Sequence, residues 1–105
     1  MYALHCKNSK DILEAEQAGY KVEYVGRPTP WGNPFTHLPL KGTRAMFHVS
    51  SREESIAKYR EWLTSPEQAD LLAEAKLRLK GKVLTCWCKP KACHADVLIE
   101  LVNEG

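Results

Sequence analysis

The stretch "KVLTCWCKPKACHADVLIELVN", Lys82 to Asn103, decides the fold because it joins an apolar strand to an amphipathic helix. Lys82–Cys88 is predicted to be a strand, and a tight Lys-Pro turn follows it. From Cys93 onward, apolar side chains recur at helical spacing and predict a closing helix with one buried face. That face is formed by Val97, Leu98, Leu101 and Val102.

Strands and helices alternate through the rest of the chain as well. Further strands are predicted at Tyr2–Cys6 and Lys21–Val25, with a helix between them that begins at Asn8 or Ser9. Such alternation is typical of an α/β protein with a parallel sheet and right-handed crossovers. We therefore expect residues 1–105 to form a single small three-layer, Rossmann-like domain, with a short parallel sheet of about three strands and about four helices.

Two more helices are predicted in the middle of the chain. The first begins with a capping-box pattern from Ser51 to Glu54. The second follows a capping residue at Ser65, with Gln68 completing another capping box. Between the second strand and these helices, residues 26–42 contain four of the six prolines and three glycines, so no regular element is expected there. A loop of this length in so small a domain is often functional.

Bulk composition excludes several classes of protein. The chain has 105 residues, 44% of them hydrophobic, and a net charge of +2, which is too small to indicate nucleic-acid binding by charge alone. The N-terminus has no signal-peptide pattern, and no apolar run approaches the ~20 residues that span a bilayer. We expect a cytoplasmic protein without a membrane partner, in which thiols are reduced and disulfides are the least expected use of the cysteines.

Chemically interesting residues follow each predicted strand. His5 and Cys6 end the first strand, and Gly26 and Arg27 follow the second. The third ends in Cys86 and Cys88, and the helix after it opens with Cys93 and His94. Because ligands of parallel α/β sheets bind beyond the carboxyl ends of the strands, these groups are expected to lie along one edge.

The proline-rich loop supplies candidates for ligand binding: Gly26, Arg27, Trp31 and Asn33. Arg27 directly after a strand is suited to a phosphate or carboxylate, although a surface arginine would have the same pattern. The indole of Trp31, beside Asn33, is suited to stacking on a base or sugar. The alternative is that Trp31 anchors the loop to the core.

The cysteine cluster allows four interpretations. A catalytic or ligand-binding site would use Cys86 or Cys93 as nucleophile or polar anchor, His94 as proton carrier and Asp96 as a polar neighbour, since a helix N-terminus favours a reactive thiolate. A metal site, with zinc as the possible cofactor and iron as another, would use three thiolates and an imidazole. Its ligands would be Cys86, Cys88, Cys93 and His94. A redox pair, or cysteines that only fill the core, are the other two.

Two long motifs also resemble a known family. "YVGRPTPWGNPF" (Tyr24 to Phe35) and "CWCKPKACHADVL" (Cys86 to Leu98) are similar to the patterns GRP[ST]xWGNPF and CWCxPxxCHxDVL. These patterns are found in an uncharacterised family of phage and bacterial proteins, the domain of unknown function 4326. The resemblance covers about four-fifths of the chain and implies no particular reaction. A looser likeness, to an uncharacterised α/β family that lacks the second cysteine of C-x-C, favours a ligand or catalytic site over a four-ligand zinc site.

The leading hypothesis is a small α/β protein that binds a nucleotide-like or other anionic small molecule at the strand ends, with Cys/His-based catalysis left open. One rival is a metal-binding Cys3His interaction module. The other is a non-catalytic, phage-encoded binder of a host protein or of a signalling nucleotide. Composition and spacing predict neither the ligand nor the oligomeric state.

Overall fold

The central sheet has three parallel strands. The computed structural model describes residues 1–27, 29–36, 47–87, 91 and 93–104. Within them β1 (Ala3–His5), β2 (Val22–Tyr24) and β5 (Val83–Cys86) are ordered β1-β5-β2. Both edge strands pair with β5 in parallel, with Ala3 opposite Leu84. The predicted parallel α/β class is confirmed. The central strand is β5, which comes from the Lys82–Asn103 stretch.

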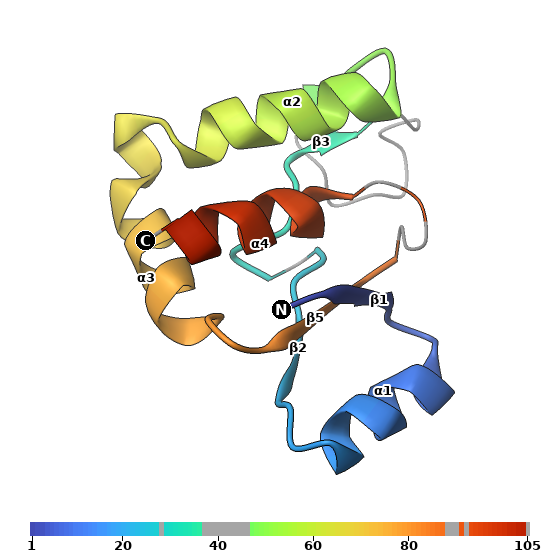
Figure 1. The fold of residues 1–105 in the computed structure, drawn as a ribbon. Coiled ribbons are helices and arrows are strands. Elements are labelled where there is room, and N and C mark those ends of the chain that lie inside the picture. Colours follow the sequence, from blue (N-terminus) through green and yellow to red (C-terminus); the bar gives the residue numbers. More distant parts are fainter. Residues whose placement is uncertain (28, 37–46, 88–90, 92, 105) are drawn as a thin grey trace.

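Helices cover both sides of this sheet, as Figure 1 shows. Helix α1 (Ser9–Gln17) lies on one side, and α4 (His94–Glu104) lies on the other. Helices α2 (Arg52–Leu63) and α3 (Ala69–Arg78) pack against α4, and a short 3₁₀ helix, Pro66–Gln68, joins them. The three-layer arrangement and the four α-helices found among the described residues agree with the prediction. None of the helices in the described part of the chain is long and apolar enough to cross a membrane.

Local signals place the helix starts, with one exception. The side chain of Asn8 accepts a hydrogen bond from the Asp11 N–H at the start of α1, and that of Ser51 caps α2. Ser65 is the N-cap of the 3₁₀ helix and Pro66 its first residue, as predicted, but the Ser65 side chain makes no capping hydrogen bond, so the predicted capping box with Gln68 is wrong. The Ser65 hydroxyl donates to the Trp62 carbonyl at 2.6 Å instead, because the preceding helix ends next to it and this carbonyl accepts hydrogen bonds from the residues that follow the helix.

The proline-rich segment contains a strand that was not predicted. Two-residue strands β3 (Phe35–Thr36) and β4 (Phe47–His48) pair in parallel, so the expectation of no regular element in residues 26–42 is wrong. The rings of Phe35 and Phe47 stack with their centroids 5.2 Å apart. A strand of two residues is too short to show a periodicity in the sequence. Its partner strand lies beyond ten residues that the structure does not describe.

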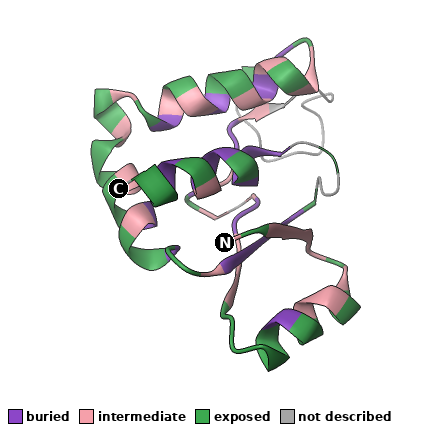
Figure 2. Ribbon diagram, viewed as in Figure 1, coloured by how far each residue is buried: buried purple, intermediate pink, exposed green. Residues whose placement is uncertain are grey.

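The hydrophobic core lies between the sheet and α4. All four residues of β5 are buried, whereas α1 buries only Ala15 (Figure 2). Because side chains alternate along a strand, Leu84 and Cys86 share one face, and both belong to the core cluster with α4. The last residue of the central strand therefore points to the first turn of α4.

Candidate functional site

The carboxyl ends of the three strands meet the start of α4. The backbone N–H of Cys6 donates to the Cys86 carbonyl at 2.8 Å, and that of Val25 donates to the Thr85 carbonyl at 3.0 Å. His94, the first residue of α4, reaches the Val25 carbonyl. Cys6, Cys86 and His94, three of the groups expected at one edge of the sheet, thus lie close together, whereas Cys88 is outside the described residues.

Cys93 and His94 form a thiol–imidazole pair at this edge. The Nε2 of His94 lies 2.8 Å from the carbonyl oxygen of Val25, which can only accept a hydrogen bond. In neutral His94 the proton therefore sits on Nε2, and Nδ1 is left as the acceptor. That Nδ1 lies 3.5 Å from the Cys93 sulfur. The arrangement suits transfer of the thiol proton to His94.

The surroundings of His94 keep it neutral. Burial lowers the pKa of its imidazole, and the positive charge of Arg27 lowers it further, while the bond to Val25 and the charge of Asp96 oppose these effects. The ring of Tyr59 packs edge-on against it, with ring centroids 5.1 Å apart. A neutral imidazole facing a thiol is the form that accepts a proton.

The first turn of α4 surrounds the Cys93 sulfur with polar groups. The Ala95 N–H points at this sulfur from 3.4 Å, and the Asp96 carboxylate accepts the Cys93 N–H at 3.1 Å. Cys93 and Asp96 thus act as a helix cap and its reciprocal partner. Asp96, predicted as a polar neighbour of His94, holds the backbone of Cys93 through this bond and also acts on the imidazole through its charge.

Cys86 lies directly against Cys93. Their sulfur atoms are 2.7 Å apart, and both residues are buried. Cys6, Cys86 and Cys93 are present as thiols. The structure thus places two of the predicted cysteines in direct contact.

Arg27 and Gly26 lie where β2 leaves the sheet. The Nη1 of half-buried Arg27 donates to the Asn33 carbonyl at 3.2 Å. The hydroxyl of Tyr24 donates to the Arg27 carbonyl at 2.8 Å, which brings the tyrosine ring over Gly26. A Cβ at Gly26 would lie 2.4 Å from that hydroxyl, so only glycine fits under the ring without a shift.

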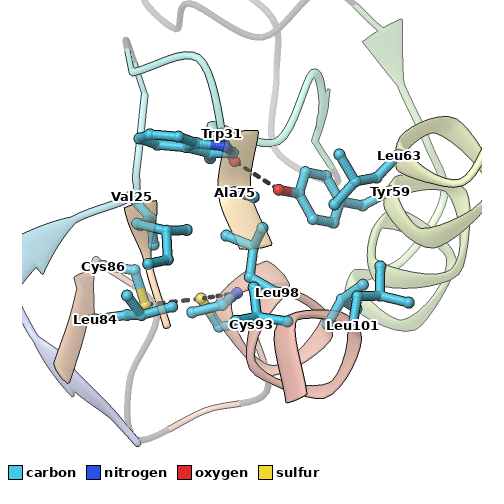
Figure 3. Close-up of a cluster of buried hydrophobic side chains, with 14 residues drawn as sticks. Val25, Trp31, Tyr59, Leu63, Ala75, Leu84, Cys86, Cys93, Leu98 and Leu101 are labelled. Carbon is cyan, nitrogen blue, oxygen red and sulfur yellow. Dashed lines mark hydrogen bonds between the residues drawn. The ribbon is translucent and has the colours of Figure 1, made fainter. Parts of the chain in front are cut away.

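Trp31 and Asn33 hold the loop to the core. The indole of Trp31 is buried in the core cluster, and its carbonyl accepts the Tyr59 hydroxyl at 2.7 Å (Figure 3). The Asn33 amide donates to the Ser55 hydroxyl at 2.8 Å, and its side-chain oxygen accepts the Phe35 N–H at 2.9 Å. Both residues were predicted to touch a ligand, and in this structure both contact the protein interior. The Nε1 of Trp31 is buried and has no hydrogen-bond partner in the described part of the chain.

The metal interpretation depends on a residue outside the described part. Cys88 is one of its four ligands and lies among the residues that the structure does not describe. Among residues 1–27, 29–36, 47–87, 91 and 93–104, no group of three or more His, Cys, Asp or Glu is arranged to hold a metal ion. Cys86, Cys93 and His94 remain the other predicted ligands, and the Nε2 of His94 is bonded to Val25.

Trp87 is the aromatic residue at this edge that sequence reasoning did not single out. It follows β5 and is 57% exposed, and the ammonium group of Lys7 lies 5.4 Å from its ring centroid. The Trp87 side chain hydrogen-bonds Tyr24, whose pKa is raised by burial. Because an indole N–H only donates, the bonds run from Trp87 to Tyr24 and on to the Arg27 carbonyl. The sequence signal was a tryptophan at the carboxyl end of a parallel strand.

Comparisons with known proteins agree on one family. The family model described as "Domain of unknown function (DUF4326)" matches residues 5–104. An "uncharacterized 12.4 kDa protein in nrdA-td intergenic region" of Enterobacteria phage T4 is 32% identical in an alignment of 88 residues that covers 80% of this chain and 72% of that protein. No solved structure matches the chain.

Proposed function

The chain belongs to the DUF4326 family, and we propose that it binds a nucleotide-like or other anionic small molecule at the carboxyl edge of the β1-β5-β2 sheet. Neither the family description nor the phage relative's name specifies an activity. The proposal therefore rests on the groups at that edge. The observation that carries it is that Arg27, Trp87 and the N-terminus of α4 lie together at this edge. His94, at the start of α4, bonds the Val25 carbonyl, and Tyr24 bonds both Trp87 and the Arg27 carbonyl.

Arg27 is the group that would hold the anion. Its hydrogen bond to the Asn33 carbonyl uses one of the five guanidinium N–H donors, and it forms no ion pair with an Asp or Glu in the described part of the chain. A guanidinium held in this way can bind two oxygen atoms of a phosphate or carboxylate. The N-terminus of α4 adds a positive dipole on the same side.

Trp87 is the group on which a base would stack. Its indole is mostly exposed and is oriented by the edge-on ring of His5, with centroids 5.6 Å apart. Stacking of a base on an aromatic side chain is worth ~1–3 kcal/mol. Trp87 takes the role that the sequence suggested for Trp31, whose indole is buried.

Thermal unfolding with a ligand panel tests the proposal. The panel pairs nucleoside 5′-phosphates with the matching nucleosides and inorganic phosphate. A ligand present at ~100 times its Kd stabilises the folded state by ~2.7 kcal/mol. At least one phosphorylated compound should raise the unfolding temperature, and its nucleoside should raise it less.

Matched arginine variants locate the binding. Arg27→Gln removes a charge-assisted contact of ~1.5–3 kcal/mol and should weaken the affinity roughly 10- to 100-fold. Arg78→Gln is the control, because Arg78 pairs with Glu74 on the exposed face of α3. Equal affinity in the two variants, or a panel without effect on the wild type, would refute the proposal.

Thiol catalysis on the bound molecule is a second candidate, favoured by the contact of Cys93 with His94. In this reaction the thiol proton moves to Nδ1 and the sulfur forms a bond to an electrophilic carbon of the ligand. The leaving group then departs with the proton from His94. Alkylation of Cys93 by chloroacetamide, followed by mass spectrometry, should be slowed several-fold in His94→Gln and should be blocked by a ligand from the panel. Unchanged rates in that variant would exclude His94 as the base.

A further inference from the structure

The contact between Cys86 and Cys93 is suited to the formation of a disulfide bond. The two sulfur atoms lie 2.7 Å apart and come from different elements, the end of β5 and the start of α4 (Figure 3). A disulfide bond is ~2.0 Å long, so the sulfur atoms would have to approach by less than ~1 Å. Both side chains are fixed in the core cluster, which holds them in this arrangement.

We propose that Cys86 and Cys93 form a reversible dithiol–disulfide couple, and that a small-molecule disulfide such as glutathione disulfide oxidises it. In a reducing cytoplasm the dithiol is the resting form. The couple stands on the sulfur contact alone and does not depend on a ligand at the sheet edge.

The reaction consumes one molecule of the small disulfide and releases two small thiols. The Cys93 thiol first passes its proton to Nδ1 of His94, 3.5 Å away, and the sulfur then attacks one sulfur of the oxidant. The S–S bond of the oxidant breaks, and its first half leaves as a thiolate that takes up the proton. The Cys86 sulfur then attacks the Cys93 sulfur of the mixed disulfide, the bond to the second half of the oxidant breaks, and the departing thiolate takes up the proton that Cys86 gives up. The protein loses two electrons and two protons in total.

Oxidation changes the environment of His94. The bond to Cys86 uses the sulfur that faces Nδ1, so the thiol proton is lost and Nδ1 no longer has that donor. If Cys93 is the nucleophile of the second candidate function, the disulfide abolishes that activity. This consequence rests on the proposed function, whereas formation of the bond does not.

Peptide mapping of the oxidised protein tests the couple directly. The full chain is incubated with glutathione disulfide, remaining thiols are blocked with N-ethylmaleimide, and the protein is digested with trypsin. Cleavage after Lys82 and Lys91 places Cys86 and Cys93 in different peptides, because trypsin does not cut between Lys89 and Pro90. We expect the two peptides to be joined, with two hydrogen atoms lost, and to separate after treatment with dithiothreitol.

The remaining cysteines serve as controls. Cys88 shares a tryptic peptide with Cys86, so the mapping is repeated on Cys88→Ser, which should retain the link. Cys86→Ser should lose it. Half-buried Cys6 should mainly be recovered with N-ethylmaleimide attached or as a mixed disulfide. The absence of the link in the wild type, or its loss in Cys88→Ser, would overturn the proposal even if ligand binding at Arg27 were established.

Discussion

Replacing Tyr59 with Phe should loosen the loop that carries Arg27. The hydroxyl of Tyr59 donates to the Trp31 carbonyl at 2.7 Å, and the residue is 0% exposed. Burial raises the pKa of this hydroxyl well above its ordinary value of 10, so it remains protonated at any practical pH. The variant deletes one oxygen atom and leaves the carbonyl buried without this donor.

The expected loss follows from that burial. A buried acceptor deprived of its donor costs ~1–3 kcal/mol. In a domain of this size each kcal/mol lowers the unfolding temperature by ~4–8 °C, so a fall of at least ~4 °C is expected. Urea unfolding followed by circular dichroism should give the same free-energy loss with an unchanged m-value.

Tyr20→Phe provides the matched control. Tyr20 is 44% exposed, and its ring contacts Tyr2 at the surface. Loss of its hydroxyl should change stability by less than ~0.5 kcal/mol. Equal unfolding free energies for the two variants would refute the reasoning, because they would mean that the Tyr59 bond contributes nothing beyond an exposed hydroxyl.

Three further predictions concern backbone packing, pH and metal. Gly26→Ala should cost ~1–3 kcal/mol in urea unfolding, because its Cβ would lie 2.4 Å from the hydroxyl oxygen of Tyr24; a loss that is no smaller when Tyr24 is also changed to Ala would contradict this cause. The pKa of folded His94 lies below its ordinary 6.5 through burial, so the unfolded chain binds more protons and stability should fall as pH drops below 6.5. The slope is at most ~1.4 kcal/mol per pH unit, and a His94→Gln profile with the same fall would exclude His94 as its source. Protein purified without added metal should contain far less than one zinc or iron per chain by elemental analysis; about one per chain, lost in Cys88→Ser, would instead support the metal-binding module.

Much of the fold was predictable because its signals are local. Asn8 and Ser51 cap their helices through bonds that reach only three residues along the chain. The β3–β4 pair was missed because each strand has two residues and its stability comes from a partner elsewhere. At Ser65 the local pattern was present, but a carbonyl of the preceding helix supplied a competing partner for the hydroxyl.

The candidate site was likewise predicted in part from the sequence. The sequence placed Arg27, Cys86, Cys93 and His94 at the ends of strands and the start of a helix, and a parallel sheet then brings such positions to one edge. It did not show which of Trp31 and Trp87 is available to a ligand, because the residue type alone does not reveal whether a tryptophan side chain is buried or exposed. Trp31 is buried and Trp87 is 57% exposed.

By itself, the sequence determined the class of fold, the order along the chain of the four α-helices and the three strands of the central sheet, and the cluster of thiols and imidazole that follows the last of these strands. These follow from periodicity, capping residues and the position of residues relative to strand ends. Only the tertiary structure decided which groups face one another. The bond between His94 and Val25 joins residues 69 apart in the chain, and the bond between Tyr59 and Trp31 joins residues 28 apart. Such pairings depend on how the helices pack on the sheet, which no short stretch of sequence encodes.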